Sequence, residues 1–410
     1  MTDNTSKQGP LAGVRVLDMS RILAGPSATQ ILGDYGAEVI KIEKPGAGDD
    51  TRKWGPPFLK DKDGNDTTVS AYYLCANRNK QSLTLDFTKP EGLAIIKQLL
   101  ATSDILFENY KTGTLDRYGL GYDQLKDEFP HLIYCSLTGF GHTGPYRDRP
   151  GYDYMIQGMG GIMSLNGPID GDPFKMPVAF ADIMTGLYSL NGILAALYSR
   201  EKTGKGQMID IALLDTQVAV MTNVAQYYLT GGQEPPRIGN AHLSIVPYEV
   251  FKAADGYIVL AVGNDRQFRD FCTFAGKPEL GTDPRFARNQ DRVVNRDALT
   301  AMIRDMVAQH PQNYWIDGLE ERDVPCGPVN TIKQVFNDPQ VKARNMAISM
   351  THPASPDPVT LLGNPVVFSG TPVTYRRPPP MLGQDTDDIL RGTLGMTDDA
   401  IAGLRDKGIV

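Results

Sequence analysis

The chain of 410 residues lacks the features that mark membrane, secreted or nucleic-acid-binding proteins. No run of apolar residues approaches the roughly 18–20 that are needed to span a bilayer. The opening residues 1–8 form neither an apolar signal segment nor an arginine-rich amphipathic pattern. The formal net charge of -7 lacks the basic excess that non-specific binding to nucleic acid or to an anionic membrane requires. We therefore expect a cytoplasmic protein without nucleic-acid or membrane partners.

Cysteine is also scarce, and its placement excludes several kinds of site. The four cysteines, Cys75, Cys135, Cys272 and Cys326, stand far apart, with no CxxC pair and no nearby histidine cluster. This spacing argues against a disulfide framework and against a tetrahedral zinc site. No cysteine has a histidine in a plausible partnering motif, so thiol catalysis is not expected. Cys135 lies in an apolar segment and is interpreted as a buried strand residue.

Strands and helices alternate through the first half of the chain. Residues 14–18 and 38–43 have the apolar character of strands, and a helix is predicted between them from Pro26 to Tyr35. The same alternation continues through 82–87, 90–102, 104–109, 115–129 and 132–140. It predicts an α/β fold in which a mostly parallel, doubly wound sheet carries helices on both faces.

The second half of the chain changes character after residue 230. A long helix is predicted over 182–202 and a strand over 207–213, followed by a helix through Tyr228. After a Gly- and Pro-containing break at 230–236, a hairpin over 248–261 turns at Asp255-Gly256. Further helices over 265–276, 291–309 and 311–322 complete a smaller α+β domain. Because the chain is too long for one ordinary core, we expect two domains.

The first strand–helix unit is superficially like a dinucleotide site. Residues 19–26 between strand and helix contain one glycine where the fingerprint requires three at fixed spacing. No GxxxxGK[ST] phosphate loop is present either. Two interpretations of this turn stay open. The helix N-terminus and Arg21 face an anion, or the turn is an ordinary one with Arg21 in solvent.

Several segments together carry a family resemblance. They are Leu11–Asp18 with Leu23–Pro26, Gly36–Glu43 with Pro45–Arg52, Asn77–Lys80, Glu108–Tyr110, Leu115–Gly119, Thr138–Gly141 with Gly144-Pro145, Gly151–Asp153, and Ala181-Asp182 with Thr185-Gly186. In this order they resemble the class III CoA transferases (CaiB/BaiF family), which include formyl-CoA and carnitine CoA transferases. The resemblance runs from about residue 10 to the C-terminus. Residues 239–248 and 377–384 are most similar to the branch of succinate–hydroxymethylglutarate CoA transferase.

The resemblance implies an enzyme that transfers coenzyme A between an acyl-CoA, such as succinyl-CoA, and a carboxylic acid, such as glutarate or hydroxymethylglutarate. The nucleophile of the family matches Asp182, which would form an aspartyl anhydride and then an aspartyl-CoA thioester. Asp182 precedes an apolar helical run, so we expect its carboxylate at the positive helix end and ionised. The alternative is a helix cap without catalysis. No metal and no permanently bound cofactor is required, because CoA is itself a substrate.

The residues that match the family's CoA contacts are Leu23, Ala24, Lys44, Asn77, Arg78, Asn79, Lys80, Asn109, Tyr110, Lys111, Arg117, Tyr118 and Tyr152. The resemblance implies that the backbone of Leu23 and Ala24 lines the pantetheine path and that Tyr152 lies close to Asp182. The remaining residues would face the nucleotide and its phosphates. The alternatives are solvated surface charges for the basic residues and a packed core position for Tyr152.

The sequence departs from formyl-CoA transferase at the cover of the site. His242-Leu243-Ser244-Ile245 stands where that enzyme carries glycines, and Leu23 stands at the position of its active-site glutamine. These departures disfavour formate and oxalate as substrates. We expect Arg21, His242 and Ser244 to bind the acid substrate, with Arg21 or His242 holding the second carboxylate of a dicarboxylic acid. A structural loop position is the alternative for His242.

Two other functions and a quaternary arrangement are also considered. The fold family includes α-methylacyl-CoA racemases, but Tyr152-Asp153 stands where these enzymes have a histidine followed by an aspartate. A CoA-binding module without catalysis is the other alternative. The resemblance further implies an interlocked homodimer. The large domain would then occupy 1–202 and the small domain 231–322, while 203–230 and the beginning of 323–410 cross between them before the chain returns to the large domain.

Overall fold

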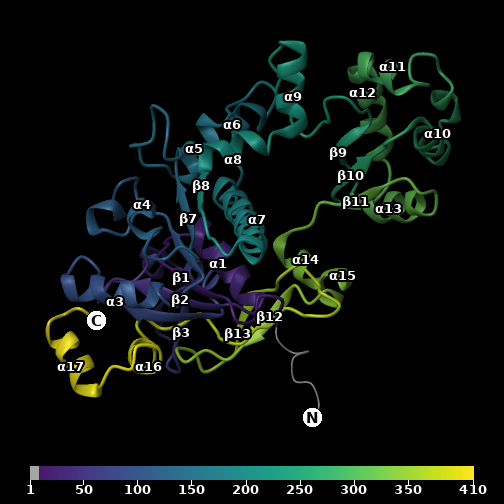
Figure 1. Ribbon diagram of the computed structural model, residues 1–410. Coiled ribbons are helices and arrows are strands. Elements are labelled where there is room, and N and C mark those ends of the chain that lie inside the picture. The colour runs from purple at the N-terminus through teal and green to yellow at the C-terminus, as the bar shows by residue number, and fades with distance from the viewer. Residues whose placement is uncertain (1–8) are drawn as a thin grey trace. The chain divides into compact units, whose positions relative to one another are not determined.

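The computed structural model describes residues 9–410 (Figure 1). These residues form two compact units. The larger unit comprises the chain up to Met163 together with Lys175–Gln233 and Lys342–Val410, and the smaller comprises Ser164–Phe174 and Glu234–Val341. The predicted boundaries of the domains and of the crossing segments stay predictions.

A six-stranded parallel sheet forms the centre of the larger unit, with the strand order β5-β2-β1-β6-β7-β8. Its strands are β1 (Arg15–Asp18), β2 (Glu38–Glu43), β5 (Lys80–Thr84), β6 (Ile105–Glu108), β7 (Ile133–Thr138) and β8 (Met208–Ala212). Successive side chains of a strand point to opposite faces. Val16 therefore packs in one apolar cluster and Leu17 in another. Both faces are buried, as a parallel sheet requires.

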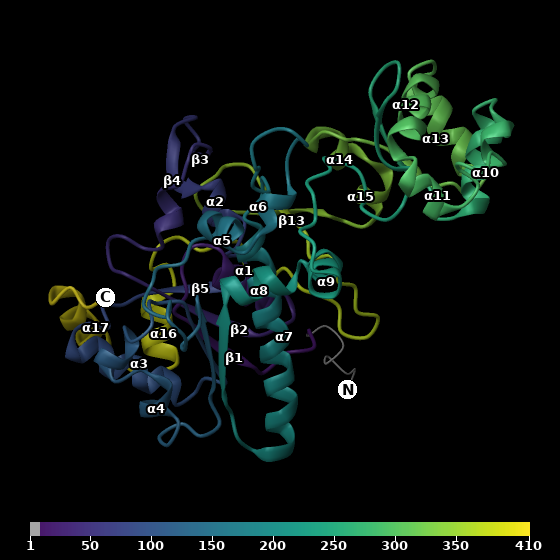
Figure 2. The same ribbon diagram turned by 90° about the horizontal axis from the view of Figure 1, so that it is seen from above.

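Helices cover both faces of this sheet (Figures 1 and 2). The cluster that contains Val16 includes residues of α1 (Ala24–Asp34), α5 (Asp153–Met159) and α7 (Phe180–Thr203). The cluster that contains Leu17 includes residues of α3 (Pro90–Leu100), α4 (Tyr122–Leu125), α16 (Thr386–Gly392) and α17 (Asp398–Asp406). The C-terminal helices therefore complete a core that the N-terminal strands begin, and the fold is the predicted α/β arrangement.

The other elements of the larger unit and its borders are β3 (Phe58–Lys60), β4 (Asp66–Ser70), β12 (Ala347–Met350), β13 (Val359–Leu362), α2 (Ala71–Leu74), α6 (Ile162–Leu165), α8 (Leu213–Ala219), α9 (Thr222–Gly231) and α15 (Pro339–Ala343), with 3-10 turns at Asp50–Lys53 and Leu115–Tyr118. The helix predicted over 115–129 is wrong as a continuous element. Gly119 has a φ of 70° and ends the 3-10 turn Leu115–Tyr118, and α4 begins as a separate helix at Tyr122.

The smaller unit has an antiparallel sheet in the order β11-β10-β9. Its elements are β9 (Tyr248–Lys252), β10 (Tyr257–Ala261), β11 (Cys326–Pro328), α10 (Asp265–Phe274), α11 (Asn289–Val294), α12 (Arg296–Val307), α13 (Gln312–Glu320) and α14 (Ile332–Asn337), with a 3-10 turn at Pro278–Gly281. The predicted hairpin is present, with Tyr257 paired to Lys252. Its apolar core includes Phe251, Phe268, Ile303 and Trp315.

One helix among residues 9–410, α7, is long and apolar enough to cross a membrane by length and composition, with a mean hydropathy of 1.3. The sequence alone did not mark this helix as a candidate span, because polar residues such as Ser189 and Asn191 interrupt its apolar run. Half of that helical window is buried inside the fold. Core helices of soluble proteins meet the same criterion, so this finding alone is weak evidence for a membrane span.

Candidate active site

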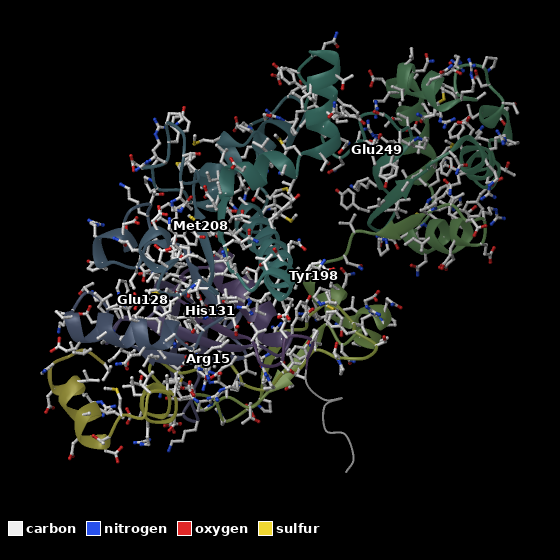
Figure 3. All side chains as sticks on the ribbon, in the orientation of Figure 1. Arg15, Glu128, His131, Tyr198, Met208 and Glu249 are labelled. Carbon is white, nitrogen blue, oxygen red and sulfur yellow. The ribbon has the colours of Figure 1, made fainter. Side chains whose placement is uncertain are left out.

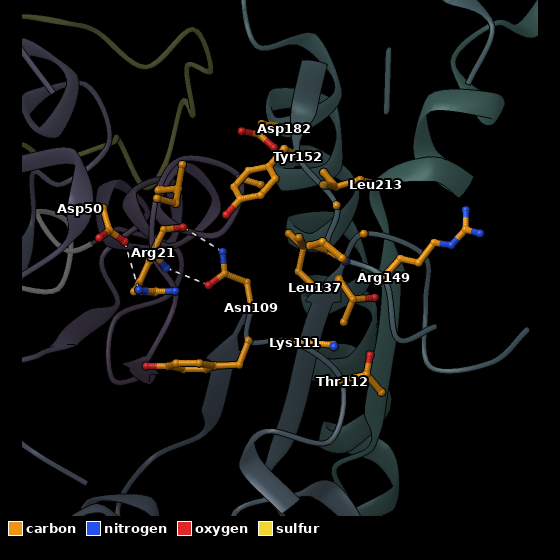
Figure 4. A pocket seen from close by; sticks show the side chains of 17 residues that line it. Arg21, Asp50, Asn109, Lys111, Thr112, Leu137, Arg149, Tyr152, Asp182 and Leu213 are labelled. Atoms are coloured by element: carbon orange, nitrogen blue, oxygen red, sulfur yellow. Dashed lines mark hydrogen bonds and ion pairs between the residues drawn. The ribbon is translucent and has the colours of Figure 1, made fainter. Parts of the chain in front are cut away.

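A pocket opens at the carboxyl ends of the parallel strands, where the strand order reverses around β1. In doubly wound sheets, ligands bind outside the carboxyl ends of the strands at such a point. The pocket has a volume of about 230 Å³ (Figure 4). Arg21 and Ile22 reach it from the segment after β1, Asn109 from the segment after β6, and Leu213 from the end of β8. Asp182 enters from the first turn of α7.

A close approach of two helices fixes the position of Asp182. Gly186 of α7 packs against the beginning of α1, and a Cβ atom at Gly186 would stand 2.6 Å from the Ala24 carbonyl oxygen. Ala24, the first residue of α1, lines the same pocket as Asp182. Because Gly186 has no side chain, the first turns of both helices converge on the pocket.

The beginning of α7 is capped by another carboxylate. The Asp153 Oδ1 atom accepts hydrogen bonds from the Ala181 amide at 2.8 Å and from the Asp182 amide at 3.3 Å. Its Oδ2 atom accepts a bond from Gln157 Nε2 at 2.8 Å. Asp153 thus occupies the positive end of the helix that was expected to favour an ionised Asp182.

The environment of Asp182 therefore corrects the expectation of a carboxylate stabilised in its charged form. Burial, with a contribution from the neighbouring negative charge of Asp153, raises the pKa of Asp182 to about 7. Among residues 9–410, none donates a hydrogen bond to the Asp182 carboxylate. A carboxylate that is poorly stabilised in its charged form is more basic and more nucleophilic than one in solution once it is ionised.

Two tyrosines belong to the surroundings of Asp182. Tyr152 is 65% exposed and lines the pocket together with Asp182 (Figure 4), so the alternative of a packed core tyrosine is wrong. Tyr72 comes from α2, and burial together with the negative charge of Asp182 raises its pKa to about 12. Sequence reasoning missed Tyr72, because nothing in its local pattern relates it to α7.

A second pocket of about 420 Å³ adjoins the first. Arg21, Asp50 and Tyr110 line both pockets, and Lys44 lines the second. The Arg21 Nη1 atom lies 3.1 Å from Asp50 Oδ2, and its guanidinium stands 5.6 Å from the centre of the Tyr110 ring. The two pockets together form an elongated site with Asp182 towards one end and a lysine towards the other.

Four predicted CoA-contact residues lie in the protein interior instead. Asn77, Arg78, Asn79 and Lys80 are each at most 3% exposed. Arg78 pairs with Asp34 at 2.6 Å, and the Lys80 ammonium lies 3.1 Å from an Asp18 carboxylate oxygen. Their side chains already have protein partners and cannot face a nucleotide without leaving them. In this structure the four side chains therefore have a structural role, and the predicted contact of this segment with CoA stays a prediction.

The remaining predicted residues lie in several different surroundings. Lys111 lines the Asp182 pocket, while Leu23 is the buried residue before α1. Arg117 is exposed on the 3-10 turn after β6, and Tyr118 packs its ring edge-on against Phe87. His242 and Ser244 belong to the smaller unit and are not among the residues that line either pocket. The His242 Nδ1 atom accepts a hydrogen bond from the Ser244 amide at 3.1 Å.

Sequence reasoning also missed several residues that line the Asp182 pocket. They are Ile22, Asp50, Thr112, Leu137, Thr138, Gly139, Arg149, Pro150, Gly151 and Leu213. Many of them lie at or shortly after the carboxyl ends of predicted strands, and this position was the available signal. Within the described part of the chain, no group of three or more His, Cys, Asp or Glu residues is arranged to hold a metal ion.

Comparison with known proteins identifies the class to which this fold and pocket belong. The sequence pattern of CoA-transferase family III matches residues 11–386. The chain belongs to this family, and it is a CoA-transferase.

Relatives cover almost the full length of the chain. A succinate–glutarate CoA-transferase of Agrobacterium fabrum is 45% identical over 95% of this chain and 97% of its own length. The human succinyl-CoA:glutarate CoA-transferase is 45% identical over 98% of this chain and 90% of its own. An acetyl-CoA:oxalate CoA-transferase of Acetobacter aceti is 39% identical over 92% of this chain and 94% of its own length. The crystal structure of a CaiB/BaiF family protein from Brucella suis has a TM-score of 0.84 and 47% identity, covering 94% of this chain and 100% of that chain.

Proposed function

We propose that this enzyme transfers CoA from succinyl-CoA to glutarate or a similar dicarboxylate, with Asp182 as the nucleophile. The observation that carries the proposed chemistry is a partly buried Asp182 with a raised pKa, in the pocket at the reversal point of a parallel sheet. The substrate pair follows from the relatives that are 45% identical over nearly the whole chain.

The reaction proceeds through two kinds of covalent intermediate. An Asp182 oxygen attacks the thioester carbonyl carbon of succinyl-CoA, the C–S bond breaks, and CoA thiolate leaves a mixed anhydride. The thiolate attacks the aspartyl carbonyl carbon, and succinate departs as its carboxylate while aspartyl-CoA thioester remains. The acceptor carboxylate attacks that thioester and releases thiolate again. Attack of this thiolate on the acceptor's acyl carbon yields the new CoA ester and regenerates Asp182 without net proton transfer.

The two adjoining pockets support a path for CoA. The thioester end would lie beside Asp182, with the backbone of Leu23 and Ala24 along the pantetheine. The nucleotide end would lie in the pocket of Lys44, and Tyr110 would stand where the two pockets meet. Asn109 and Lys111 would form part of the wall, and the exposed Arg117 would meet the phosphates from outside.

The arrangement around Asp182 favours transfer over racemisation. A racemase needs a free acid and base beside the α-carbon of its substrate. The carboxylate oxygens of Asp153 are already bonded to the Ala181 amide and to Gln157. Tyr152, next to Asp153 in the sequence, carries a phenol where the racemases carry an imidazole.

Arg21 is the cation that we propose for the second carboxylate of a dicarboxylic acid; Lys111 and Arg149 also line the pocket. Arg21 lines the pocket of Asp182. Its side chain is about half exposed and forms an ion pair with the exposed Asp50. Surface pairs of this kind contribute little stability, so a substrate carboxylate can replace Asp50 at small cost. His242 and Ser244 remain proposed as residues that bind the acid substrate.

We expect glutarate to exceed butyrate, its monocarboxylate analogue, by about ten- to a hundredfold in kcat/KM, because a charge-assisted hydrogen bond contributes about 1.5–3 kcal/mol. Arg21→Gln should remove most of this preference. Any effect of the substitution on CoA binding cancels in the ratio of the two acids. His242→Ala is the matched variant. If this substitution removes the preference for glutarate over butyrate, the contact with the second carboxylate belongs to His242 instead. The panel should include oxalate and be measured with succinyl-CoA by mass spectrometry of the CoA esters. Equal rates for butyrate and glutarate, or oxalate as the best acceptor, contradict the dicarboxylate assignment.

We also propose an interlocked homodimer. The long helix α7 leaves Ile183 and Leu187 each 38% exposed and Tyr198 65% exposed. Figure 3 labels Tyr198 on this helix. Large apolar side chains left exposed along one helix favour an interface with another chain. We expect a dimer that does not dissociate on dilution without unfolding. A stable folded monomer at sub-micromolar concentration in light scattering would contradict it.

A further inference from the structure

Side chains bind most backbone polar groups of residues 20–22, which lie between β1 and α1. The Ser20 amide donates to Asp18 at 2.9 Å, and the Ser20 carbonyl accepts from Lys41 Nζ at 2.8 Å. Asn109 binds both backbone polar groups of Arg21. Its Oδ1 atom accepts a hydrogen bond from the Arg21 amide at 2.9 Å, and its Nδ2 atom donates one to the Arg21 carbonyl oxygen at 2.8 Å (Figure 4).

The residue that follows Ser20 and Arg21 is Ile22, and its backbone conformation is unfavourable. Ile22 has a φ of 73°, in the left-handed region that β-branched residues rarely adopt. Its amide lies 3.3 Å from both carboxylate oxygens of Asp49. The nearby Lys41 ammonium and the Thr51 amide help to hold the pKa of Asp49 at about 2 against the opposing effect of burial, so this acceptor is ionised.

The strained residue lies at the reacting end of the site. Ile22 and Ala24 line the same pocket as Asp182, and α1 begins at Ala24. A strained conformation persists only where its surroundings over-determine it, and such residues cluster at functional sites. Without the clamp, Ile22 would relax to a negative φ and turn the beginning of α1 relative to Asp182.

We infer that Asn109 is a positioning residue, which holds Ile22 left-handed so that the beginning of α1 faces the reacting carbonyl. This role differs from the direct CoA contact that the family resemblance implies for Asn109. It rests on the proposed function of the Asp182 pocket. Both polar atoms of the Asn109 side chain bond to the backbone of Arg21. Asn109 therefore affects the reaction through the backbone of residues 21 and 22.

A double-mutant cycle with glycine tests this inference, since glycine adopts positive φ without a clamp. Asn109→Ala should lower kcat for succinyl-CoA and glutarate by about tenfold or more, because small displacements at reacting centres have large effects on rate. In the Ile22→Gly background, the same substitution should lower kcat by less than about threefold. Lys111→Ala is the control, because this residue also lines the pocket. Its effect should be equal in both backgrounds.

The outcomes separate the positioning role from its alternatives. An equal loss in both backgrounds, or no loss from Asn109→Ala, overturns it. Asn109→Asp provides a second variant of the same shape, which keeps the acceptor for the Arg21 amide and loses the donor to its carbonyl. Ile22→Asn provides a second background, since asparagine tolerates the left-handed region. Thermal unfolding verifies that each variant is folded. If Asp182→Asn retains activity, the proposed function fails instead, whatever the cycle shows.

Discussion

Asp182→Asn should lower the rate of CoA transfer by at least about a thousandfold, because the amide has the shape of the carboxylate without its nucleophilicity. The affinity for CoA should stay within a few-fold of the wild type. Transfer between succinyl-CoA and glutarate measures the first quantity, and equilibrium binding of CoA measures the second. Wild-type protein mixed with acyl-CoA and hydroxylamine should gain the mass of a hydroxamate, and the variant should not. Retention of more than about a tenth of the wild-type turnover, a barrier change of roughly 1.4 kcal/mol, would refute covalent catalysis by Asp182.

The pH profile provides an independent readout of the same nucleophile. The reactive species is the ionised carboxylate, and the pKa of Asp182 is raised to about 7. The value of kcat/KM should therefore rise with pH up to about 7 and then level off. Asp153→Asn removes a neighbouring negative charge but keeps an acceptor for the Ala181 amide, so it should move this rise to lower pH. A wild-type rise centred below about pH 5 would contradict the raised pKa.

Asp34→Ala should destabilise the protein by about 3–5 kcal/mol, the effect of leaving a buried charge without its partner. The Asp34 carboxylate accepts bonds from the Arg78 Nε atom at 2.9 Å and from the Nη2 atom at 2.6 Å. It also accepts from the amides of Asn79 and Asn364. Asp34 is fully buried and Arg78 is 3% exposed, so water cannot replace the lost carboxylate. The midpoint of urea unfolding measures the change.

Two further variants make the Asp34 experiment decisive. Asp123→Ala removes the exposed partner of Lys126 and should cost no more than about 1 kcal/mol. Arg78→Leu combined with Asp34→Ala removes both buried charges, and it should recover part of the stability. In this double variant the KM for succinyl-CoA should stay within a few-fold of the wild type. A KM more than about tenfold higher with an unchanged unfolding midpoint would support the predicted contact of Arg78 with CoA.

Local sequence signals determined much of the fold. The apolar segments at 14–18 and 38–43 with a helix between them predicted β1, α1 and β2, because strand and helix periods differ and are legible over a few residues. The order of the motifs up to Asp182 pointed to a CoA transferase, and the family match confirms it. The continuous helix over 115–129 was wrong, because the left-handed Gly119 outweighs the apolar pattern around it.

The tertiary structure alone decided how these residues serve the site. Asn77–Lys80 forms a polar motif that the sequence cannot distinguish from a surface one, and only the fold brings Asp34 and Asp18 against it. The pKa of Asp182 likewise depends on Asp153 and on burial. The clamp on Ile22 joins the segments after three different strands of the sheet. Charges and hydrogen bonds act across space over a few ångströms, and the chain positions that they join are adjacent only after folding.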